Sequence, residues 1–448
     1  MSSKRFTIGK AKIHLNPLRV EFPYSFIGFK EKLDFIEILE FADGYENEIL
    51  QTPEFLHLLD ICACVLGVSY YKLLAPFEIE AKEITLTKSE SEFILDVYEN
   101  GLGEFFARNK LKRYGKIKFS SEKYIEQKKP NISLRDRILL PIGGGKDSLV
   151  SVQLLEKANL EFTPFAVNPK GPIISSIKRI GKSPIYVKRI LDKKMIELGR
   201  MEGFYNGHVP STAINSMIAA LCALLFDFDN IALSNERSAS EGNVEFDGRL
   251  ANHQYSKSLE FEKLIADVLK NATGGELKYY SLLRPFSEVK IANIFEKENR
   301  FDDAFSSCNA NFKLTGHDGN LWCCNCPKCH FVFLILAMDM DKDRLMKIFG
   351  KNLLNDEKNE RAYKELTGLV GHKPWECVGE ILEAAACLFA LCGKKDWQDD
   401  LLIAKLKNNL VNYYGEEKLK NALDDLLEDS FDHLIPKNIY EKVMFNAL

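Results

Sequence analysis

The stretch RILLPIGGGKDSLVSVQLLEKA, residues 137–158, decides the fold, because it runs from an apolar segment through three glycines into an amphipathic segment. This order predicts a buried strand, a loop and a helix. Glycines accept positive φ and leave room for close approach. The backbone N–H groups of Gly143, Gly144 and Gly145 can therefore face an anion beside the helix N-terminus. The stretch predicts a loop that holds phosphate.

The same alternation of apolar run, loop and helix continues along the chain. The runs expected to form strands are EFTPFAVN (161–168), SPIYVKRI (183–190), NIALSN (230–235) and KYYSLL (278–283). The segments expected to form helices are KKMIELGRM (193–201), STAINSMIAALCALLF (211–226), SKSLEFEKLIADVLK (256–270) and SEVKIANIFEK (287–297). Strands that alternate with helices form parallel sheets. The predicted fold class is α/β, a parallel sheet with helices on both faces.

The regions on either side of this unit have other patterns. Residues 1–130 mix short strand-like runs with one apolar helical stretch (54–75), which predicts an α+β N-terminal domain. The parallel-sheet domain is expected over 131–349, and the helical patterns beyond it predict a helical C-terminal region over 350–448. The basic stretch from Arg108 to Lys129 is interpreted as a solvated linker, with a phosphate-binding surface as the alternative.

Composition limits the classes of function. The chain has 448 residues, of which 46% are apolar and 28% charged, and it lacks a continuous apolar run of 18 residues. Its beginning, MSSKRFTIGK, lacks the apolar core of a signal peptide, so a cytoplasmic protein without a membrane partner is expected. The net charge of −4 gives no general attraction to nucleic acid.

Cysteines form a second dense signal in SCNANFKLTGHDGNLWCCNCPKCHF, residues 307–331. Cys308 and the C-x2-C-x2-C run of Cys323, Cys326 and Cys329 suit a closed, structural, tetrahedral Zn²⁺ site. Cys324 is a spare thiol that could replace one ligand. An iron–sulfur cluster and free thiols remain alternatives. The cysteines on apolar helical patterns are expected in the core, namely Cys62, Cys64, Cys222, Cys387 and Cys392.

The glycine loop resembles the PP-loop of ATP pyrophosphatases, S-G-G-x-D-S, with Gly143 in place of the first serine. It does not match the Walker A or dinucleotide patterns, which require glycines where Leu140 and Ser148 stand. The string LLRPFSEVKIANIF (282–295) resembles a second motif of the PP-loop enzymes. This resemblance implies an adenine nucleotide α-hydrolase-like fold.

The same resemblance assigns roles around ATP and Mg²⁺. The loop glycines and Ser148 hold pyrophosphate, Lys146 neutralises it, and Asp147 helps to place Mg²⁺. The residues expected to bind nucleotide are Gly143, Gly144, Gly145, Ser148, Val167 against adenine, and Arg284 from the second motif.

Longer polar strings resemble the ATP-dependent UDP-N-acetylmuramoyl-L-alanyl-L-glutamate epimerase family, the MurL type, across nearly the whole chain. These strings are GLGEFFARNKL (101–111), NGHVPSTAINS (206–216), SNERSASEGN (234–243), NHQYSKS (252–258) and KPWECVGE (373–380). The resemblance implies inversion of the terminal L-glutamate of a muropeptide precursor, with ATP converted to AMP and pyrophosphate. The cysteine pattern also resembles that of 7-cyano-7-deazaguanine synthase, whose chain is much shorter.

Polar groups crowd the end of the NIALSN strand, where a parallel sheet binds its substrate. Arg237 could clamp the glutamate side-chain carboxylate, and the histidines have pKa values suited to proton exchange. The candidate catalytic residues are Lys146, Asp147, Glu236, Arg237, His208 and His253. The candidate substrate-binding residues are Asn235, Glu241, Lys257 and Glu376, the last beside Cys377. The sequence leaves the base and the acid open.

Adenylation explains the expected use of ATP. Removing the α-proton beside a free carboxylate would create a dianion, whereas the mixed anhydride gives an enolate of lower charge. Two alternatives stay open. One is a PP-loop enzyme that adenylates or thiolates a tRNA base or a deazaguanine-type carboxylate, and the other is a nucleotide-binding regulator without turnover. The expected partner is a small nucleotide-linked muropeptide rather than nucleic acid, and the sequence does not define an oligomeric state.

Overall fold

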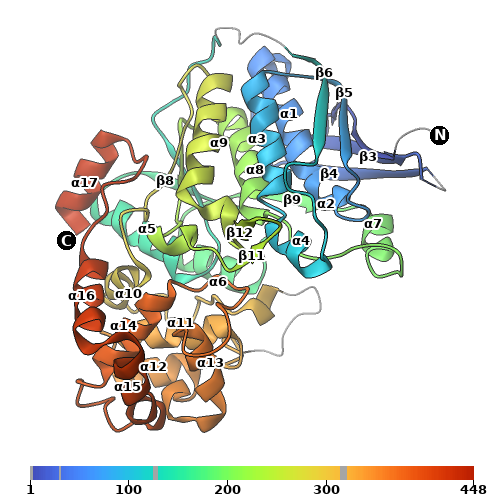
Figure 1. The fold of residues 1–448 in the computed structure, drawn as a ribbon. Coiled ribbons are helices and arrows are strands. Elements are labelled where there is room, and N and C mark those ends of the chain that lie inside the picture. Colours follow the sequence, from blue (N-terminus) through green and yellow to red (C-terminus); the bar gives the residue numbers. More distant parts are fainter. Residues whose placement is uncertain (1–3, 30–31, 125–129, 313–319, 448) are drawn as a thin grey trace.

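The structure is a computed structural model that describes residues 4–29, 32–124, 130–312 and 320–447. One 11-stranded sheet runs through it in the order β13-β10-β7-β8-β9-β4-β3-β1-β5-β6, with β2 paired to β3 (Figure 1). A separate two-stranded sheet joins β11 (Val244–Phe246) to β12 (Arg249–Ala251). The chain is therefore built around a single large sheet.

The half of the sheet that follows the glycine loop is parallel. Its strands are β7 (Ile138–Pro141), β8 (Phe162–Val167), β9 (Ile185–Ile190), β10 (Asn230–Leu233) and β13 (Lys278–Ser281). Each neighbouring pair among them is parallel. Helices follow these strands: α5 (Lys146–Lys157), α6 (Gly171–Ile180), α7 (Lys193–Leu198), α8 (Ser211–Leu225), α9 (Leu259–Ala272) and α10 (Glu288–Glu296). The predicted alternation of strands and helices is confirmed.

The other half of the sheet comes from the N-terminal region and is mixed. Its strands are β1 (Arg5–Ile8), β2 (Lys12–His14), β3 (Arg19–Ile27), β4 (Leu33–Glu40), β5 (Glu78–Leu86) and β6 (Lys118–Tyr124). Its helices are α1 (Pro53–Leu66), α2 (Val68–Tyr71), α3 (Lys88–Glu99) and α4 (Gly103–Asn109). Antiparallel pairing of β4 with β9 makes this half continuous with the parallel half. The sheet as a whole is mixed, not purely parallel.

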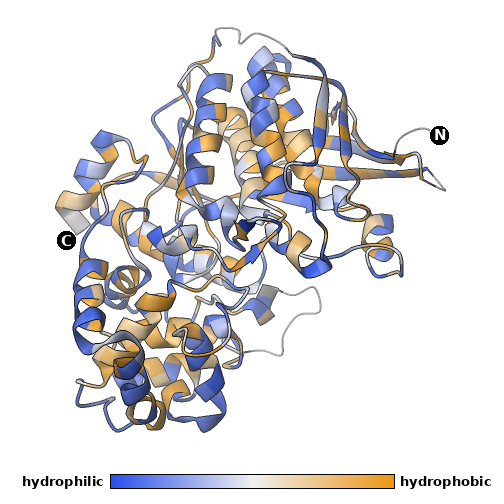
Figure 2. Cartoon of the chain, in the orientation of Figure 1, coloured by the Kyte–Doolittle hydropathy of each residue, from blue (hydrophilic) through white to orange (hydrophobic). Residues whose placement is uncertain are grey.

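Two apolar cores lie on the two faces of the parallel half. Successive side chains of a strand point to opposite faces. In β7, Leu139 accordingly joins the core formed with α1, α8 and α9, while Leu140 joins the core formed with α5, α10 and the C-terminal helices. Figure 2 shows hydrophobic residues gathered where these helices meet the sheet. The prediction of helices on both faces is confirmed.

The C-terminal part of the chain is helical, as predicted. It contains α11 (Pro327–Leu336), α12 (Lys342–Phe349), α13 (Glu360–Leu366), α14 (Ile381–Leu391), α15 (Leu401–Tyr414), α16 (Glu416–Leu427) and α17 (Lys437–Ala447). Helix α17 returns to pack against α5 (Figure 1). The first core combines residues from before and after position 130, and the second from before and after 349. The domain limits at these positions stay predictions.

The expectation for the basic stretch needs correction. The basic stretch is not a linker throughout, because Lys118–Tyr124 forms β6, which pairs in parallel with β5 at the edge of the sheet. Residues 125–129 of that stretch lie outside the described residues.

The segment Pro53–Tyr71 is long and apolar enough to cross a membrane, although it contains charged residues. Because 89% of its apolar window is buried inside the protein, it serves as a core helix.

A buried ion pair closes the junction between the two halves of the sheet. Arg189 of β9 donates from Nε to Glu37 Oε1 at 2.6 Å and from Nη2 to Oε2 at 3.2 Å, across the β4–β9 pairing. Its Nη2 also donates to Ser69 Oγ at 2.8 Å. Burial raises the pKa of the Glu37 carboxyl, and Arg189 opposes that rise. The carboxylate therefore depends on the guanidinium as its buried partner.

We expect Arg189→Met to destabilise the protein by about 3–5 kcal/mol, because Glu37 would keep a buried charge without a partner. Urea unfolding would measure the change. The double variant Glu37→Leu/Arg189→Met should regain most of the loss, since it removes both charges. Lys420→Met, which breaks an exposed pair with Glu416, is the control and should cost less than about 1 kcal/mol. A loss equally small for Arg189→Met would contradict this account of the junction.

Candidate active site

A cavity of about 290 Å³ lies at the carboxyl ends of β7 and β10, where the parallel sheet is expected to bind ligands. It lies between the glycine loop, the first turns of α5 and α8, and segments from the C-terminal part of the chain. Its lining residues are Pro141, Gly143, Gly145, Asp147, Ser148, Thr212, Asn215, Ser216, Leu233, Ser234, Asn235, Lys257, Ser306, Ser307, Asn309, Lys328 and Cys377. Six of the residues predicted from sequence are in this set.

The glycine loop is held tightly on one side and open on the other. Gly144 has φ +79°, and a Cβ there would lie 2.8 Å from the backbone N of Ile173 at the start of α6. The Gly144 carbonyl accepts a hydrogen bond from Ser306 N at 2.9 Å. Gly143, by contrast, has open space around its Cα. Gly145 precedes the 12-residue helix α5, whose N-terminus therefore meets the cavity and favours an anion.

Besides the Cys377 thiol, the lining residues include three charged side chains. These are the lysines Lys257 and Lys328 and the carboxylate Asp147. Lys146, expected to neutralise phosphate, is not part of the lining. Its ammonium is fully buried and forms ion pairs with Asp147 and Glu288. The cations that face the cavity are therefore Lys257 and Lys328.

Three carboxylates gather beneath the loop. Oxygens of Asp147, Glu236 and Glu288 lie within 4.8 Å of one another. Burial would raise the pKa of the Asp147 carboxyl, but Lys146 and Lys328 outweigh burial and lower it. For Glu288, burial raises the pKa of the carboxyl despite the opposing effect of Lys146. Glu288 Oε1 has no hydrogen-bond partner among the described residues and lies 3.9 Å from Lys328 Nζ. Sequence reasoning missed Glu288, although it belongs to the LLRPFSEVK string.

A second cluster joins residues from three parts of the chain. His253 Nδ1 contacts Glu104 Oε2 of α4, and the His253 ring also lies close enough to Cys377 for the two groups to shift each other's pKa. Lys257 Nζ lies 3.6 Å from Cys377 Sγ. Burial alone would raise the pKa of the Cys377 thiol, but Lys257 and His253 lower it to about 6. Burial lowers that of His253, yet Cys377 and Glu104 raise it to about 9.

The two predicted histidines do come together. Their ring centroids are 4.6 Å apart, and His208 Nδ1 lies 3.8 Å from Glu104 Oε2. Burial and the neighbouring His253 lower the pKa of His208 to about 4. At neutral pH the pair therefore consists of a charged His253 and a neutral His208. The string GLGEFFARNKL contained Glu104, but its pairing with His253 has no signal in the sequence.

Other predicted residues lie around the cavity rather than in it. Arg284 is buried, pairs with Glu262, and donates to the carbonyls of Glu236 and Lys257 at 2.6 Å each, so it positions both. Val167 ends β8 and is outside the lining set. Arg237 lines a separate cavity of about 640 Å³ against α14 and α16.

Two predicted substrate residues instead hold the segment that carries Cys377. Glu241 Oε2 pairs with Lys373 Nζ at 2.6 Å. Glu376 Oε2 accepts a hydrogen bond from Lys328 N at 3.0 Å. Neither is in the lining set of the 290 Å³ cavity, so their contact with substrate stays a prediction.

The four predicted cysteines form one cluster. The Sγ atoms of Cys308, Cys323, Cys326 and Cys329 all lie within 4.8 Å of one another. The Cys329 Sγ is 3.7 Å from that of Cys323 and 3.5 Å from that of Cys326. Cys324 has φ +56° and points away, with its Sγ 3.2 Å from the Phe349 carbonyl. The structure thus places Cys323, not Cys324, in the cluster.

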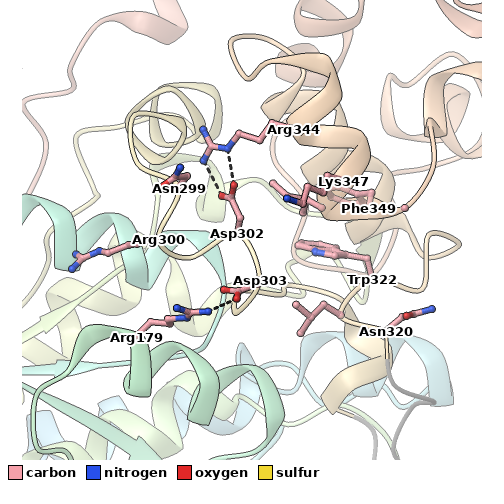
Figure 3. A pocket seen from close by; sticks show the side chains of 13 residues that line it. Arg179, Asn299, Arg300, Asp302, Asp303, Asn320, Trp322, Arg344, Lys347 and Phe349 are labelled. Carbon is pink, nitrogen blue, oxygen red and sulfur yellow. Dashed lines mark hydrogen bonds and ion pairs between the residues drawn. The ribbon is translucent and has the colours of Figure 1, made fainter.

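A larger cavity of about 690 Å³ lies beside the cysteine cluster and has a different character. Four of its charged side chains form two ion pairs, Arg344 with Asp302 and Arg179 with Asp303 (Figure 3). These pairs tie the loop before Phe305 to α6 and α12. The 290 Å³ cavity is the better candidate active site, because it combines the glycine loop with a thiol and two lysines in its wall.

The fold and this site define an α/β protein in which a glycine loop at a helix N-terminus and the Cys377 thiol with His253 beside it meet at one edge of the sheet. Two family models match the chain, the MurL N-terminal domain over residues 1–282 and the MurL C-terminal domain over residues 304–421. The chain belongs to the MurL family of epimerases. No solved structure matches it.

Curated relatives agree with this assignment. A protein of Xanthomonas oryzae pv. oryzae named UDP-N-acetyl-alpha-D-muramoyl-L-alanyl-L-glutamate epimerase is 38% identical over 409 residues, which cover 91% of this chain and 89% of that protein. Proteins of the same name from Micromonospora sp. and Salinispora tropica are 37% and 36% identical. Their matches cover 90% of this chain, and 90% and 88% of the two proteins.

We expect Gly144→Ala to destabilise the protein by about 1–3 kcal/mol, because alanine would hold a positive φ and press its Cβ against the backbone of Ile173. Gly143→Ala is the matched control, since its Cβ would meet no atom within 4 Å. It should change the free energy of unfolding by less than about 1 kcal/mol. Denaturant unfolding of both variants checks this, and equal effects would contradict the described loop conformation.

Proposed function

We propose that this protein is an ATP- and Mg²⁺-dependent epimerase that inverts the terminal L-glutamate of UDP-N-acetylmuramoyl-L-alanyl-L-glutamate to D-glutamate. The substrate follows from the names of the relatives. The observation that carries the proposal is that a phosphate-type loop and the Cys377 thiol, which has His253 beside it, border the same cavity. The product would serve peptidoglycan precursor synthesis, which is consistent with the expected cytoplasmic location.

ATP would activate the carboxylate next to the α-carbon. A carboxylate oxygen attacks the α-phosphorus, the bond between the α- and β-phosphates breaks, and pyrophosphate leaves. The resulting acyl adenylate has a more acidic α-proton than a free carboxylate. A base removes that proton from one face, an acid returns one to the other, and water then releases AMP.

The cavity supports phosphate binding in three ways. The glycine loop lines the cavity at Gly143, where a Cβ would meet no atom within 4 Å, and α5 begins at the cavity. Lys257 and Lys328 add positive charge at its wall. Ser148, whose Oγ lies 3.1 Å from the Gly145 carbonyl, completes the resemblance to a PP-loop. These features favour pyrophosphate at the loop, although Lys146 is paired elsewhere.

The carboxylate cluster fits the expected Mg²⁺. Mg²⁺ prefers oxygen ligands, and Asp147, Glu236 and Glu288 offer three such groups within reach of one another. Glu288 Oε1 is a buried acceptor without a hydrogen-bond partner among the described residues. When bound, the ion would neutralise phosphate oxygens during adenylation. Sequence reasoning included Asp147 and Glu236 in this region and omitted Glu288.

The cysteine cluster fits a structural Zn²⁺. Four thiolates at a Zn–S distance of about 2.3 Å around a tetrahedral ion have sulfurs about 3.8 Å apart. The Sγ separations of 3.5 and 3.7 Å at Cys329 are close to that spacing. Cys326 also precedes α11, whose first turn carries Lys328. Metal binding would therefore hold a cavity lysine in position.

The RNA-modifying, deazaguanine-type and regulatory alternatives lack comparable support. The relatives of this chain are named as epimerases, and their matches to it cover nearly their whole lengths. The cavity also presents the Cys377 thiol, whose pKa Lys257 and His253 lower to about 6, and a regulator without turnover would have no use for it.

The proposal predicts that incubation with UDP-N-acetylmuramoyl-L-alanyl-L-glutamate, ATP and Mg²⁺ in D₂O yields D-glutamate with α-deuterium after hydrolysis and chiral analysis. Product should form only with ATP, and AMP should accumulate. Omission of ATP is the control. Inversion without ATP would refute adenylation, and AMP formation without inversion would refute the epimerase reaction.

The zinc assignment predicts about one Zn²⁺ per chain by elemental analysis, lost in Cys308→Ser and Cys323→Ser, because each removes one of four thiolates. Cys324→Ser is the matched control and should keep its zinc, since that thiol lies outside the cluster. Iron in place of zinc, or zinc loss in the control alone, would contradict the assignment.

A further inference from the structure

Cys377 stands on a segment that crosses from the C-terminal region to the cavity. Contacts on both sides fix it in place. They are Lys373 Nζ with Glu241 Oε2 at 2.6 Å, Asn243 Nδ2 with the Pro374 carbonyl at 2.9 Å, Lys328 N with Glu376 Oε2 at 3.0 Å, and Gln254 Nε2 with the Val378 carbonyl at 3.4 Å. The thiol is therefore presented by a braced segment and lines the same cavity as the glycine loop.

The neighbours of Cys377 form an ordered chain of groups. Glu104 Oε2 holds His253 at Nδ1, which leaves Nε2 of that ring for the thiol. A sulfur, an imidazole and an orienting carboxylate that contact one another in this order are the usual components of an activated thiol. Lys257 Nζ, 3.6 Å from Cys377 Sγ, adds a second positive group. The adenylation step uses Lys257 but gives no role to the thiol, to His253 or to Glu104.

We propose that Cys377 is a catalytic residue that exchanges the α-proton of the activated glutamate, and that His253, oriented by Glu104, is a positioning residue that holds the thiol. This inference rests on the proposed function. It fills the gap that the sequence left open, namely which group acts on the α-carbon. Glu236, the carboxylate named for that region, instead belongs to the cluster with Asp147 and Glu288.

The charges around the sulfur keep it ready to accept a proton. The groups that act on it are Lys257 first, then His253 and Lys328, and they lower its pKa to about 6 against the effect of burial. On the far side of His253 lie Glu104, Glu376 and the neutral His208. Between about pH 6 and pH 9 the thiolate and the imidazolium therefore coexist.

The proton transfer balances without any further reactant. The Cys377 thiolate takes the α-proton, so that an S–H bond forms as the Cα–H bond breaks, and the electron pair moves into the enolate, whose charge rests on the acyl oxygen. A donor on the opposite face then supplies a proton, and a new Cα–H bond forms from the enolate pair. The thiol returns its proton to solvent, and the donor is reprotonated from solvent.

The variant Cys377→Ser tests this role, with Cys392→Ser as the matched control because Cys392 ends α14 outside the cavity. Three reactions are followed in D₂O: substrate-dependent ATP–pyrophosphate exchange, α-deuterium uptake from each epimer, and inversion. We expect Cys377→Ser to lose inversion by at least about 100-fold. Pyrophosphate exchange should persist, and deuterium uptake should survive with one epimer at most. Cys392→Ser should match the wild type.

A pH profile distinguishes a catalytic role of Cys377 from a merely structural one. In the wild type the rate of inversion and the rate of alkylation of Cys377 by iodoacetamide should both rise through about pH 6. In Glu104→Gln and His253→Asn this rise should move toward the ordinary thiol value of about 8.5, while pyrophosphate exchange persists.

Several results would overturn the inference. Inversion by Cys377→Ser at the wild-type rate would exclude the thiol, and parallel loss of inversion and pyrophosphate exchange would assign it to activation or structure. An acyl group on Cys377, detected by intact mass, would make it a nucleophile instead of a base. Absence of pyrophosphate exchange in the wild type would refute the proposed function itself, which distinguishes the two failures.

Discussion

The buried pair of Glu37 and Arg189 is the interaction on which the architecture depends, because it closes the joint between the two halves of the sheet. On one side of that joint is the mixed N-terminal sheet, and on the other is the parallel sheet with its glycine loop. A rigid joint fixes α4, from the N-terminal half, relative to the loops of the parallel half. Glu104 on α4 can then reach His253.

The site is assembled in the same way from the C-terminal region. Helix α11 begins at the cysteine cluster and carries Lys328 in its first turn, and Lys328 N in turn holds Glu376 beside Cys377. The cluster, the wall lysine and the thiol are thus linked by short contacts. This linkage connects the cysteine cluster to the proposed proton exchange, since disturbing it would shift the segment that presents Cys377.

Charge is separated within the site in a manner that suits two tasks. The carboxylates of Asp147, Glu236 and Glu288 lie together beneath the loop, next to Lys146. The thiol lies with Lys257 and His253, both cationic. The first group suits a divalent cation and phosphates, whereas the second suits the removal of a proton and the development of negative charge on an acyl oxygen. One cavity borders both.

Sequence patterns predict the helices and strands of this protein better than the contacts between them. The strand, loop and helix of residues 137–158, the alternation after them and the cysteine spacing all depend on neighbours close in the chain, and local patterns report such neighbours directly. The basic stretch was misread in part because an edge strand with exposed charged residues resembles a linker when its partner β5 is unknown. Motif position predicts a role for Lys146 and residue type one for Arg237, whereas burial and pairing decide which way a side chain faces.

By itself the sequence determined that this chain forms an α/β enzyme with a glycine loop, a cysteine cluster and the motifs of its family. Only the tertiary structure decided that Glu104, His253 and Cys377 meet, that Glu288 joins Asp147 and Glu236, and that Cys324 is left out of the cluster. For the first two groups the reason is distance along the chain. Sheet pairing and core packing bring together residues that are far apart in sequence, and no local pattern records that proximity. Cys324 is excluded by its left-handed backbone, which turns its thiol toward the Phe349 carbonyl.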